Sequence, residues 1–386
     1  MENSEVEKSA PWGLARISHR DGLSFGTFNK YLYAADGGEG VDAYTIDTGI
    51  YTDHVDFEGR AHWGKTIPAG DADEDGNGHG THCSGTIAGK KYGVAKKANI
   101  HAVKVLRSSG SGTMSDVVKG VEWAVQAHTK KVKAAKEGKA KGFKGSVANM
   151  SLGGGKSPIL EVAVNAGVDA GLHFAVAAGN DNGDACDSSP AAAEKVVTVG
   201  ASTLADERAY FSNYGKCTDI FAPGLNILSV WTGSKHAVNT ISGTSMASPH
   251  IAGLLAYFVS LQPSKDSAFA VAEVTPEKLK KDIIHISTKG ALSDIPEDTP
   301  NVSIPIHFMK QISEPILTFY FSSLPGTAVA PTTTATLSQR VATRLMLLAA
   351  TALMSPLTTS FTRLRRSPRS SALSTATSRM LLRLKG

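Results

Sequence analysis

The sequence has few cysteines and no long apolar segment. Three cysteines among 386 residues permit at most one disulfide, which excludes a disulfide-rich scaffold. The longest apolar run, residues 345–354, falls well short of the roughly 20 residues that a membrane-spanning helix needs. The first residues, MENSEVEKSAPWG, are acidic and include no apolar stretch. We therefore expect neither a transmembrane helix nor a signal peptide in this chain.

Acidic residues are absent from the end of the chain. Residues 315–386 contain nine Lys or Arg and no Asp or Glu. Because the whole chain has a formal net charge of +5, the basic balance belongs to this segment and the remainder is acidic. Because the net positive charge comes from this segment alone, it does not indicate a nucleic-acid partner.

Between residues 41 and 262, short apolar runs alternate with helical stretches. The runs are almost continuously apolar, as in strands that are buried on both faces: residues 41–47, 98–106, 146–152, 172–178 and 195–202. This order predicts an α/β fold in three layers, with a mostly parallel central sheet flanked by helices. In such sheets, ligands bind beyond the carboxyl ends of the strands.

Two local features can be predicted as well. Residues 115–128 form a helix with Ser115 as the expected N-cap. The segment GDADEDGNG, residues 70–78, lacks the spacing and terminal Glu of an EF-hand, so we interpret it as an acidic surface loop and not as a calcium loop.

After Asn301 the composition shifts to Ser, Thr, Leu, Arg and Ala without a consistent period. Disorder is one interpretation of residues 302–386. The other is that this tail is an artefact of the gene model, because Val302-Ser303 could be encoded by GTGAGT, which resembles the start of an intron.

Three short segments place reactive side chains where strands end. YTIDTG puts Asp47 at the end of a buried strand, NGHGTHCSGT puts His79 between two glycines at a helix start, and GTSMASPH puts Ser245 at the start of an apolar helix. A serine hydroxyl needs a base to take its proton and a third group to orient that base. The helix start supplies unpaired N–H groups for an oxyanion, and Pro249, placed in the first turn, removes one donor that would have no partner there.

Each of these residues alone is weak evidence, because Ser, Asp and His at such positions are usually caps or turn residues. Their conjunction is specific. The G-x-S-x-G elbow of α/β-hydrolases is absent, and the chain order Asp, His, Ser is that of subtilisin. Spacing alone leaves His82 open as an alternative base.

The chain resembles the subtilisin-like serine proteases, in their proteinase K-type branch. The motifs AYTIDTG, DGNGHGTHCSGT, MSLGGG, AVAAGN, FSNYG and SGTSMASPH fit that family in order, and PWGLARISHR is similar to the fungal vacuolar subtilases, known also as mould allergens. The resemblance covers residues 11–301 and implies the subtilisin-like fold. It also implies a serine endopeptidase that acts through an acyl-enzyme.

The resemblance assigns roles to particular residues. It implies Asp47 as the orienting acid, His79 as the base and Ser245 as the nucleophile, with Asn180 and the Ser245 N–H as oxyanion donors. The implied walls of the specificity pocket, which favours apolar or aromatic residues, are Ser151, Leu152, Gly153, Gly154, Ala177, Ala178 and Gly179.

The resemblance also implies the state of the cysteines and one metal ligand. Cys186 and Cys217 are expected to pair, and Cys83 to be a buried free thiol. Asp219 is a candidate calcium ligand, together with backbone carbonyls near Glu194 and Val196. The chemistry itself requires no cofactor.

Family members are made with a signal peptide and an inhibitory pro-domain, and we expect neither in this chain. We accordingly interpret residues 1–10 as a remnant of the pro-domain junction, residues 11–301 as the peptidase domain and residues 302–386 as the tail. The implied protein is a vacuolar or secreted monomer that acts on peptides and proteins. The alternatives are a truncated, non-catalytic product that acts only as an IgE-binding allergen, and an esterase.

Overall fold

The computed structural model describes residues 4–267, 274–304 and 381–383, and the following account refers to these residues. The apolar run at residues 345–354 and most of the tail lie outside them. Among the described residues, no helix is both long and apolar enough to span a membrane.

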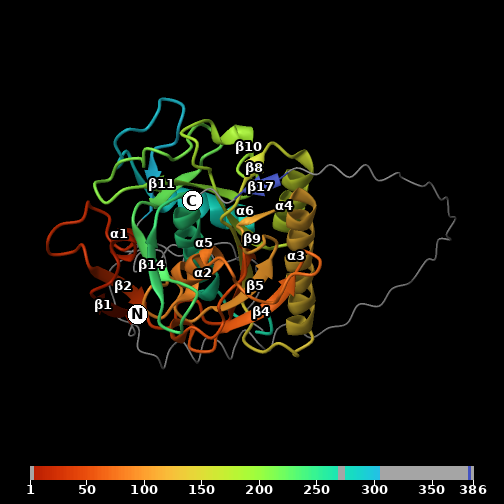
Figure 1. Cartoon of the computed structure of the whole chain (residues 1–386). Helices are drawn as coiled ribbons and strands as arrows, with labels where there is room; N and C mark the ends of the chain where they lie inside the picture. The colour runs from red at the N-terminus through yellow and green to blue at the C-terminus, as the bar shows by residue number, and fades with distance from the viewer. Residues whose placement is uncertain (1–3, 268–273, 305–380, 384–386) are drawn as a thin grey trace, which may run out of the picture. The chain divides into compact units, whose positions relative to one another are not determined.

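A single large sheet organises the described part of the chain (Figure 1). Every neighbouring pair of its strands is parallel except the edge pair β15–β16. In spatial order the strands are β15 (Thr288–Lys289), β16 (Val302–Ser303), β12 (Ile220–Pro223), β11 (Val197–Ser202), β9 (His173–Ala177), β7 (Gly145–Met150), β3 (Val41–Asp47), β5 (Asn99–Lys104) and β4 (Ala61–Thr66). The five strands predicted from apolar runs are confirmed as β3, β5, β7, β9 and β11.

Helices cover both faces of this sheet, as the three-layer prediction requires. Figure 1 shows α3 and α4 on one side of the strands and α2 and α5 on the other. The helices are α1 (Trp12–Ile17), α2 (His79–Ala88), α3 (Met114–Lys136), α4 (Pro158–Asp169), α5 (Thr244–Ser260) and α6 (Pro276–Ile286). Successive residues of β3 point to opposite faces, so Ala43 joins the core beneath α2 and α5 whereas Tyr44 joins the core beneath α3 and α4.

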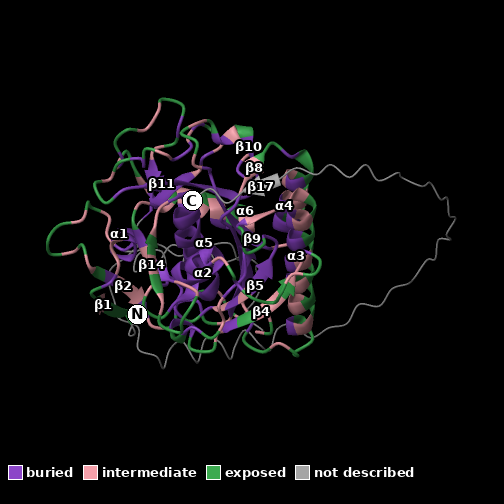
Figure 2. Cartoon of the chain, in the orientation of Figure 1, coloured by how far each residue is buried: buried purple, intermediate pink, exposed green. Residues whose placement is uncertain are grey.

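The two helices that carry His79 and Ser245 are unusually buried. All residues of α2 and α5 are buried, which Figure 2 shows as continuous purple, whereas α3 is buried on one face only. Helices that are apolar or small all round belong in the interior of a domain. The site is therefore built on rigid elements.

The start of α3 differs from the prediction. The N-cap is Thr113, whose hydroxyl accepts from the Asp116 N–H at 3.1 Å, and not Ser115. Ser115 lies within the first turn. Both residue types cap helices well, so the sequence alone could not choose between two candidates two residues apart.

The end of the domain also differs from the prediction. Val302 and Ser303 form strand β16, which pairs with β12 and β15, and Ile304 is buried in the core. The boundary placed after Asn301 therefore cuts off buried residues, because a strand of two residues carries too little pattern to be recognised. Residues 381–383 also form a strand, which pairs with residues 111–113. For the tail residues that the structure does not describe, the assignment remains a prediction.

Four two-stranded sheets complete the described part. They pair β1 (Ser4–Lys8) with β2 (Lys30–Ala34), β8 (Gly154–Gly155) with β10 (Ser188–Ser189), β13 (Ile227–Val230) with β14 (Val238–Ile241), and β6 (Ser111–Thr113) with β17 (Leu381–Arg383). Single 3-10 turns lie at η1 (Val55–Phe57) and η2 (Ala185–Asp187).

Candidate active site

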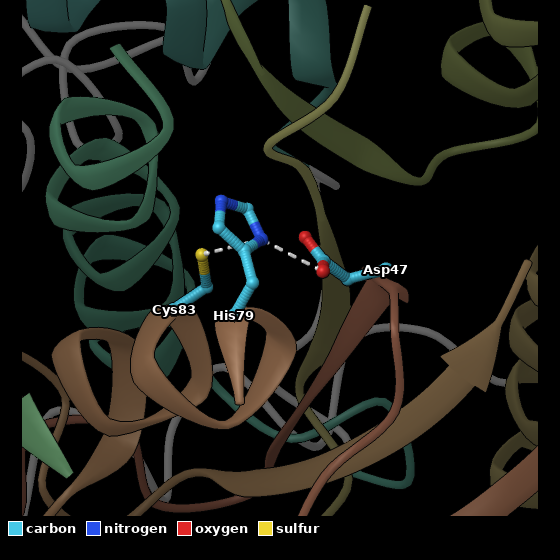
Figure 3. A group of neighbouring side chains, drawn as sticks. All are labelled: Asp47, His79 and Cys83. Carbon is cyan, nitrogen blue, oxygen red and sulfur yellow. Dashed lines mark hydrogen bonds and ion pairs between the residues drawn. The ribbon is translucent and has the colours of Figure 1, made fainter. Parts of the chain in front are cut away.

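Asp47 and His79 meet at the carboxyl end of the sheet. Asp47 is the last residue of β3, and His79 is the first residue of α2. The His79 Nδ1–H donates to Asp47 Oδ1 at 2.8 Å, and the same oxygen accepts the Thr48 N–H at 2.7 Å. Figure 3 shows the imidazole between the carboxylate and the Cys83 sulfur, which lies 4.0 Å from Nδ1. These contacts fix the orientation of the ring.

The chain reaches this geometry through two glycines. Gly78, the N-cap of α2, has φ +106°, and a Cβ there would lie 2.4 Å from the Trp231 ring. A Cβ on Gly80 would lie 2.2 Å from the Gly49 carbonyl oxygen. Gly78 therefore allows the start of α2 to pack against Trp231, and Gly80 allows it to pack against the loop after β3.

The electrostatics of His79 favour its charged form. Burial disfavours the imidazolium, but the adjacent Asp47 carboxylate outweighs this effect, and the pKa of His79 lies well above its usual value of 6.5. Among the described atoms, His79 Nε2 and Asp47 Oδ2 are buried without a hydrogen-bond partner. The pair therefore keeps one nitrogen available for a further contact.

The structure distinguishes the two histidines that spacing left open. His82 Nε2 lies 3.0 Å from the Ile227 carbonyl and 3.2 Å from the Asn239 carbonyl, so it carries the proton and donates to the β13–β14 hairpin. Burial lowers the pKa of His82 to about 3. A neutral histidine held by backbone carbonyls supports the packing of α2, whereas His79 contacts a carboxylate.

Ser245 is the second residue of α5. Its Oγ donates to the Ser151 carbonyl at 3.2 Å, and its own carbonyl accepts from Cys83 Sγ at 3.4 Å. The Cys83 sulfur thus lies between the His79 ring and the Ser245 backbone. The starts of α2 and α5, distant in sequence, are brought together at this thiol.

Pro249 has a different place from the one predicted. It is inside α5, beyond the first turn, where its missing N–H would otherwise bond the carbonyl of Ser245. The freed carbonyl accepts the Ser151 hydroxyl at 2.7 Å. By freeing this carbonyl, Pro249 allows α5 to bond the segment after β7, which the sequence pattern did not reveal because the donor comes from a distant segment.

Asn180 lies beside the start of α5. Its Oδ1 accepts the Thr244 N–H at 2.8 Å and the Thr244 hydroxyl at 2.7 Å. Because an amide group is planar, holding its oxygen also orients its NH₂ donors. The side chain expected to stabilise an oxyanion is thus fixed against the residue that precedes Ser245.

A small pocket opens next to Ser245. Small and apolar residues line it: Leu152, Gly153, Ala177, Ala178, Gly179, Ser188, Ser189, Ala191, Thr244 and Ser245. Two residues expected in its walls do not line it, because Ser151 turns its hydroxyl to the Ser245 carbonyl and Gly154 pairs with Ser189 in β8–β10. Ser188, Ser189 and Ala191 were missed, since nothing in their local sequence marks them.

Asp75 is a further residue that the sequence analysis missed. Its carboxylate accepts five hydrogen bonds, from the Thr48 hydroxyl, the Asn77 and Gly78 N–H groups, and both the N–H and hydroxyl of Thr81. Although the segment around it is exposed, Asp75 itself is buried. It fixes the start of α2 relative to the end of β3, so part of the predicted surface loop belongs to the support of the site.

The cysteine prediction is confirmed. Cys186 and Cys217 form a disulfide that closes a loop with a sequence separation of 31. Cys83 is a buried free thiol, and burial raises its pKa. A thiol held in its protonated form is a poor nucleophile.

Asp219 and the two expected carbonyls do converge, but on a lysine. Lys280 Nζ lies 2.9 Å from Asp219 Oδ2 and donates to the Glu194 and Val196 carbonyls at 2.9 and 2.6 Å. The site lies at the amino ends of β11 and β12, opposite the edge that holds Asp47. The donor set therefore does not fit a calcium ion in addition to Lys280.

Comparisons with known proteins show the family and the fold. The model of the subtilase family, peptidase S8, matches residues 39–300, and the chain belongs to this family. A solved structure described as a cold adapted subtilisin-like serine proteinase superposes with a TM-score of 0.67 at 42% identity, covering 77% of this chain and 98% of that one.

Fungal relatives are similar over most of the chain. The subtilisin-like serine protease pepC of Aspergillus niger is 76% identical over 97% of this chain and 70% of its own length. Alkaline protease 2 of Aspergillus fumigatus is 85% identical over 78% of this chain and 61% of its own length. The subtilisin-like serine protease Pen c 2 of Penicillium citrinum is 83% identical over 78% and 66%. The chain thus spans about two thirds of the length of these relatives.

Proposed function

We propose that this protein is a serine endopeptidase that hydrolyses peptide bonds through an acyl-enzyme, with Asp47, His79 and Ser245 as its catalytic residues. The contact that carries the proposal is the 2.8 Å hydrogen bond between Asp47 Oδ1 and His79 Nδ1, while the buried Nε2 of His79 has no partner in the part of the chain that the structure describes. Such a nitrogen can accept a proton from a hydroxyl.

In the proposed mechanism, Ser245 Oγ turns from the Ser151 carbonyl towards His79 Nε2 and attacks the scissile carbonyl carbon. The Oγ proton moves to Nε2, and the Asp47 carboxylate stabilises the resulting imidazolium. The new oxyanion accepts hydrogen bonds from the Asn180 amide and the Ser245 N–H. His79 then gives the proton to the departing amine, and a water molecule repeats the sequence to release the acyl group.

The pocket beside Ser245 supports a preference for substrates with an apolar or aromatic residue before the cleaved bond. Alanine and glycine line much of it, so it offers space without a charged partner. Glycines on the adjoining segment permit a substrate backbone to approach closely and to pair as an added strand. The substrates are therefore peptides and proteins with broad sequence preference.

The proposed setting follows from the disulfide and the family. The Cys186–Cys217 disulfide is compatible with an oxidising compartment, so we expect a vacuolar or secreted protein. We further propose that the protein is a monomer, that a pro-domain inhibits its site, and that the chemistry needs no cofactor.

Covalent labelling with a fluorophosphonate probe tests the assignment of Ser245. The refolded chain should label, with and without a separately added subtilase pro-domain as a folding aid. Ser245→Ala should remain unlabelled and lose kcat for peptide hydrolysis by about 10⁶-fold, the order of loss that subtilisin shows when its nucleophile is removed. Ser242→Ala is the matched control, because Ser242 bonds Asn226 and takes no part in the proposed chemistry.

Equal labelling of Ser245→Ala and the parent would overturn the assignment, as would a parent chain that is folded by circular dichroism but unlabelled under both conditions. Hydrolysis of simple esters without hydrolysis of peptides would make the protein an esterase.

A further inference from the structure

A polar cluster outside the candidate active site surrounds Lys280. An ammonium group has three N–H donors and no acceptor. Three oxygens lie within hydrogen-bond distance of Lys280 Nζ: Asp219 Oδ2 at 2.9 Å and the carbonyls of Glu194 and Val196 at 2.9 and 2.6 Å. Each donor therefore has one acceptor.

This cluster has the ligand types of a metal site but is arranged around nitrogen. A calcium ion binds six to eight oxygens at about 2.3–2.6 Å. Here one carboxylate and two carbonyls contact the Lys280 ammonium, a cation that belongs to α6 itself. A dication placed among the same oxygens would lie next to the ammonium, and the repulsion between like charges would oppose its binding.

We propose that the Lys280 ammonium takes the place of a structural calcium ion, so that this end of the sheet is stabilised without a metal. Lysine supplies the charge from α6 and attaches that helix to the segments leading into β11 and β12. The site is consequently insensitive to chelators, unlike a site that depends on a bound ion.

The contacts of Asp219 extend this attachment towards the pocket. Its Oδ2 accepts the Thr198 N–H at 2.8 Å, and the Thr198 hydroxyl donates to the Ala191 carbonyl at 2.8 Å. Ala191 lines the pocket beside Ser245. A short chain of hydrogen bonds thus connects Lys280 to the wall of the pocket.

The electrostatics are consistent with a carboxylate that needs its cation. Burial raises the pKa of Asp219, and the Lys280 ammonium and the Thr198 N–H oppose that rise. The side chains of Lys280 and Asp219 are only 17% and 20% exposed, so water compensates poorly for the loss of either. Removing the ammonium would leave a buried anion that attracts another cation.

Thermal unfolding in chelator and in millimolar calcium tests the proposal. Lys280→Met keeps the length of the side chain and removes the charge. In EDTA it should lower the Tm by about 4–8 °C, and calcium should recover at least half of that loss. Adding Asp219→Asn should abolish the recovery. Lys281→Met is the matched control, since Lys281 is exposed and pairs with Glu277 on the same helix, and its Tm should change by less than about 1 °C.

Two results would overturn the proposal. One is a Lys280→Met protein whose Tm depends on calcium no more than that of the parent. The other comes from a calcium titration by calorimetry of the parent and of Asp219→Asn, and it needs no Lys280 variant. If Asp219→Asn binds one calcium ion fewer than the parent, then the parent already holds calcium at Asp219. We expect equal numbers of bound ions.

Discussion

Two pairs of a carboxylate and a cationic side chain lie at opposite ends of the sheet, one buried and one partly buried, and their polar atoms differ in how many partners they have. At the carboxyl end, Asp47 and His79 share one hydrogen bond, while Asp47 Oδ2 and His79 Nε2 have no partner among the described residues. At the amino end, all three donors of Lys280 have acceptors.

This difference is consistent with the roles that we propose, a reactive one for the Asp47–His79 pair and a stabilising one for the Asp219–Lys280 pair. A buried polar atom without a partner costs free energy, and proteins retain such atoms where a substrate or a transferred proton supplies the missing partner. An ammonium whose three donors all have acceptors has nothing left to donate. The two sites also differ in burial, since the Asp47 and His79 side chains are 0% and 5% exposed and those of Asp219 and Lys280 are 20% and 17% exposed.

The strongest test of the comparison replaces each aspartate by asparagine. Asp47→Asn should lower kcat by about 10⁴-fold, because the amide no longer holds the reactive tautomer of His79 or stabilises its charged form. Asp219→Asn should change kcat by less than about threefold and instead lower the Tm by about 2–6 °C. Peptide hydrolysis well below the Tm and thermal unfolding measure the two effects.

An Asp219→Asn protein with a normal Tm but greatly reduced kcat would reverse the roles that we assign to the two pairs.

A second test concerns Asn180, whose amide oxygen is held by Thr244. Asn180→Ala should reduce kcat by about 10²- to 10³-fold with little change in KM, since the amide is proposed to bind only the developing oxyanion. Steady-state kinetics on a peptide substrate separate the two parameters. Asn182→Ala, on the same loop, is the control. A loss confined to KM would show that Asn180 binds the ground state instead.

The smallest expected effect is the pH dependence. Burial lowers the pKa of His79, but the Asp47 carboxylate raises it by a larger amount, so the pKa lies well above 6.5. Because the proposed base must be neutral, kcat/KM should rise about tenfold per pH unit until that raised pKa is reached. Asp219→Asn should keep this profile. A profile that is already flat above pH 6.5 would contradict the raised pKa.

The contribution of the Asp47–His79 pair to the free energy of unfolding should fall as the pH rises, whereas kcat/KM should increase. A raised folded-state pKa means that the contribution of the Asp47–His79 pair is fully present below about pH 6.5, the unfolded value, and is lost as the pH rises through the folded value. Denaturant unfolding of the parent and of Asp47→Asn at several pH values measures this contribution as the difference between them. A difference that grows with pH would contradict it.

Much of the fold could be predicted from local sequence. Continuous apolar runs predicted five strands of the sheet, and the alternation with helices predicted its parallel order. The predictions were less accurate where the signal is short. Ser115 and Thr113 are equally good caps, and the two residues of β16 carry no recognisable period.

Less of the site could be predicted. The positions of Asp47, His79 and Ser245 at element ends are visible in sequence, whereas their supports are not. The roles of Asp75, Pro249 and Ser151 depend on partners from distant segments. For the same reason the sequence alone could not choose between His79 and His82, which differ only in what the fold places against each ring.

The sequence by itself determined the α/β architecture and the residues at the ends of its strands, because apolar periodicity and turn chemistry act over short distances. The tertiary structure decided which groups are satisfied and which are left available. Lys280 illustrates this: nothing around it in sequence indicates a partner, yet the fold delivers one carboxylate and two carbonyls to its ammonium. Hydrogen-bond satisfaction is a property of atoms brought together from distant parts of the chain, and only the folded protein brings them together.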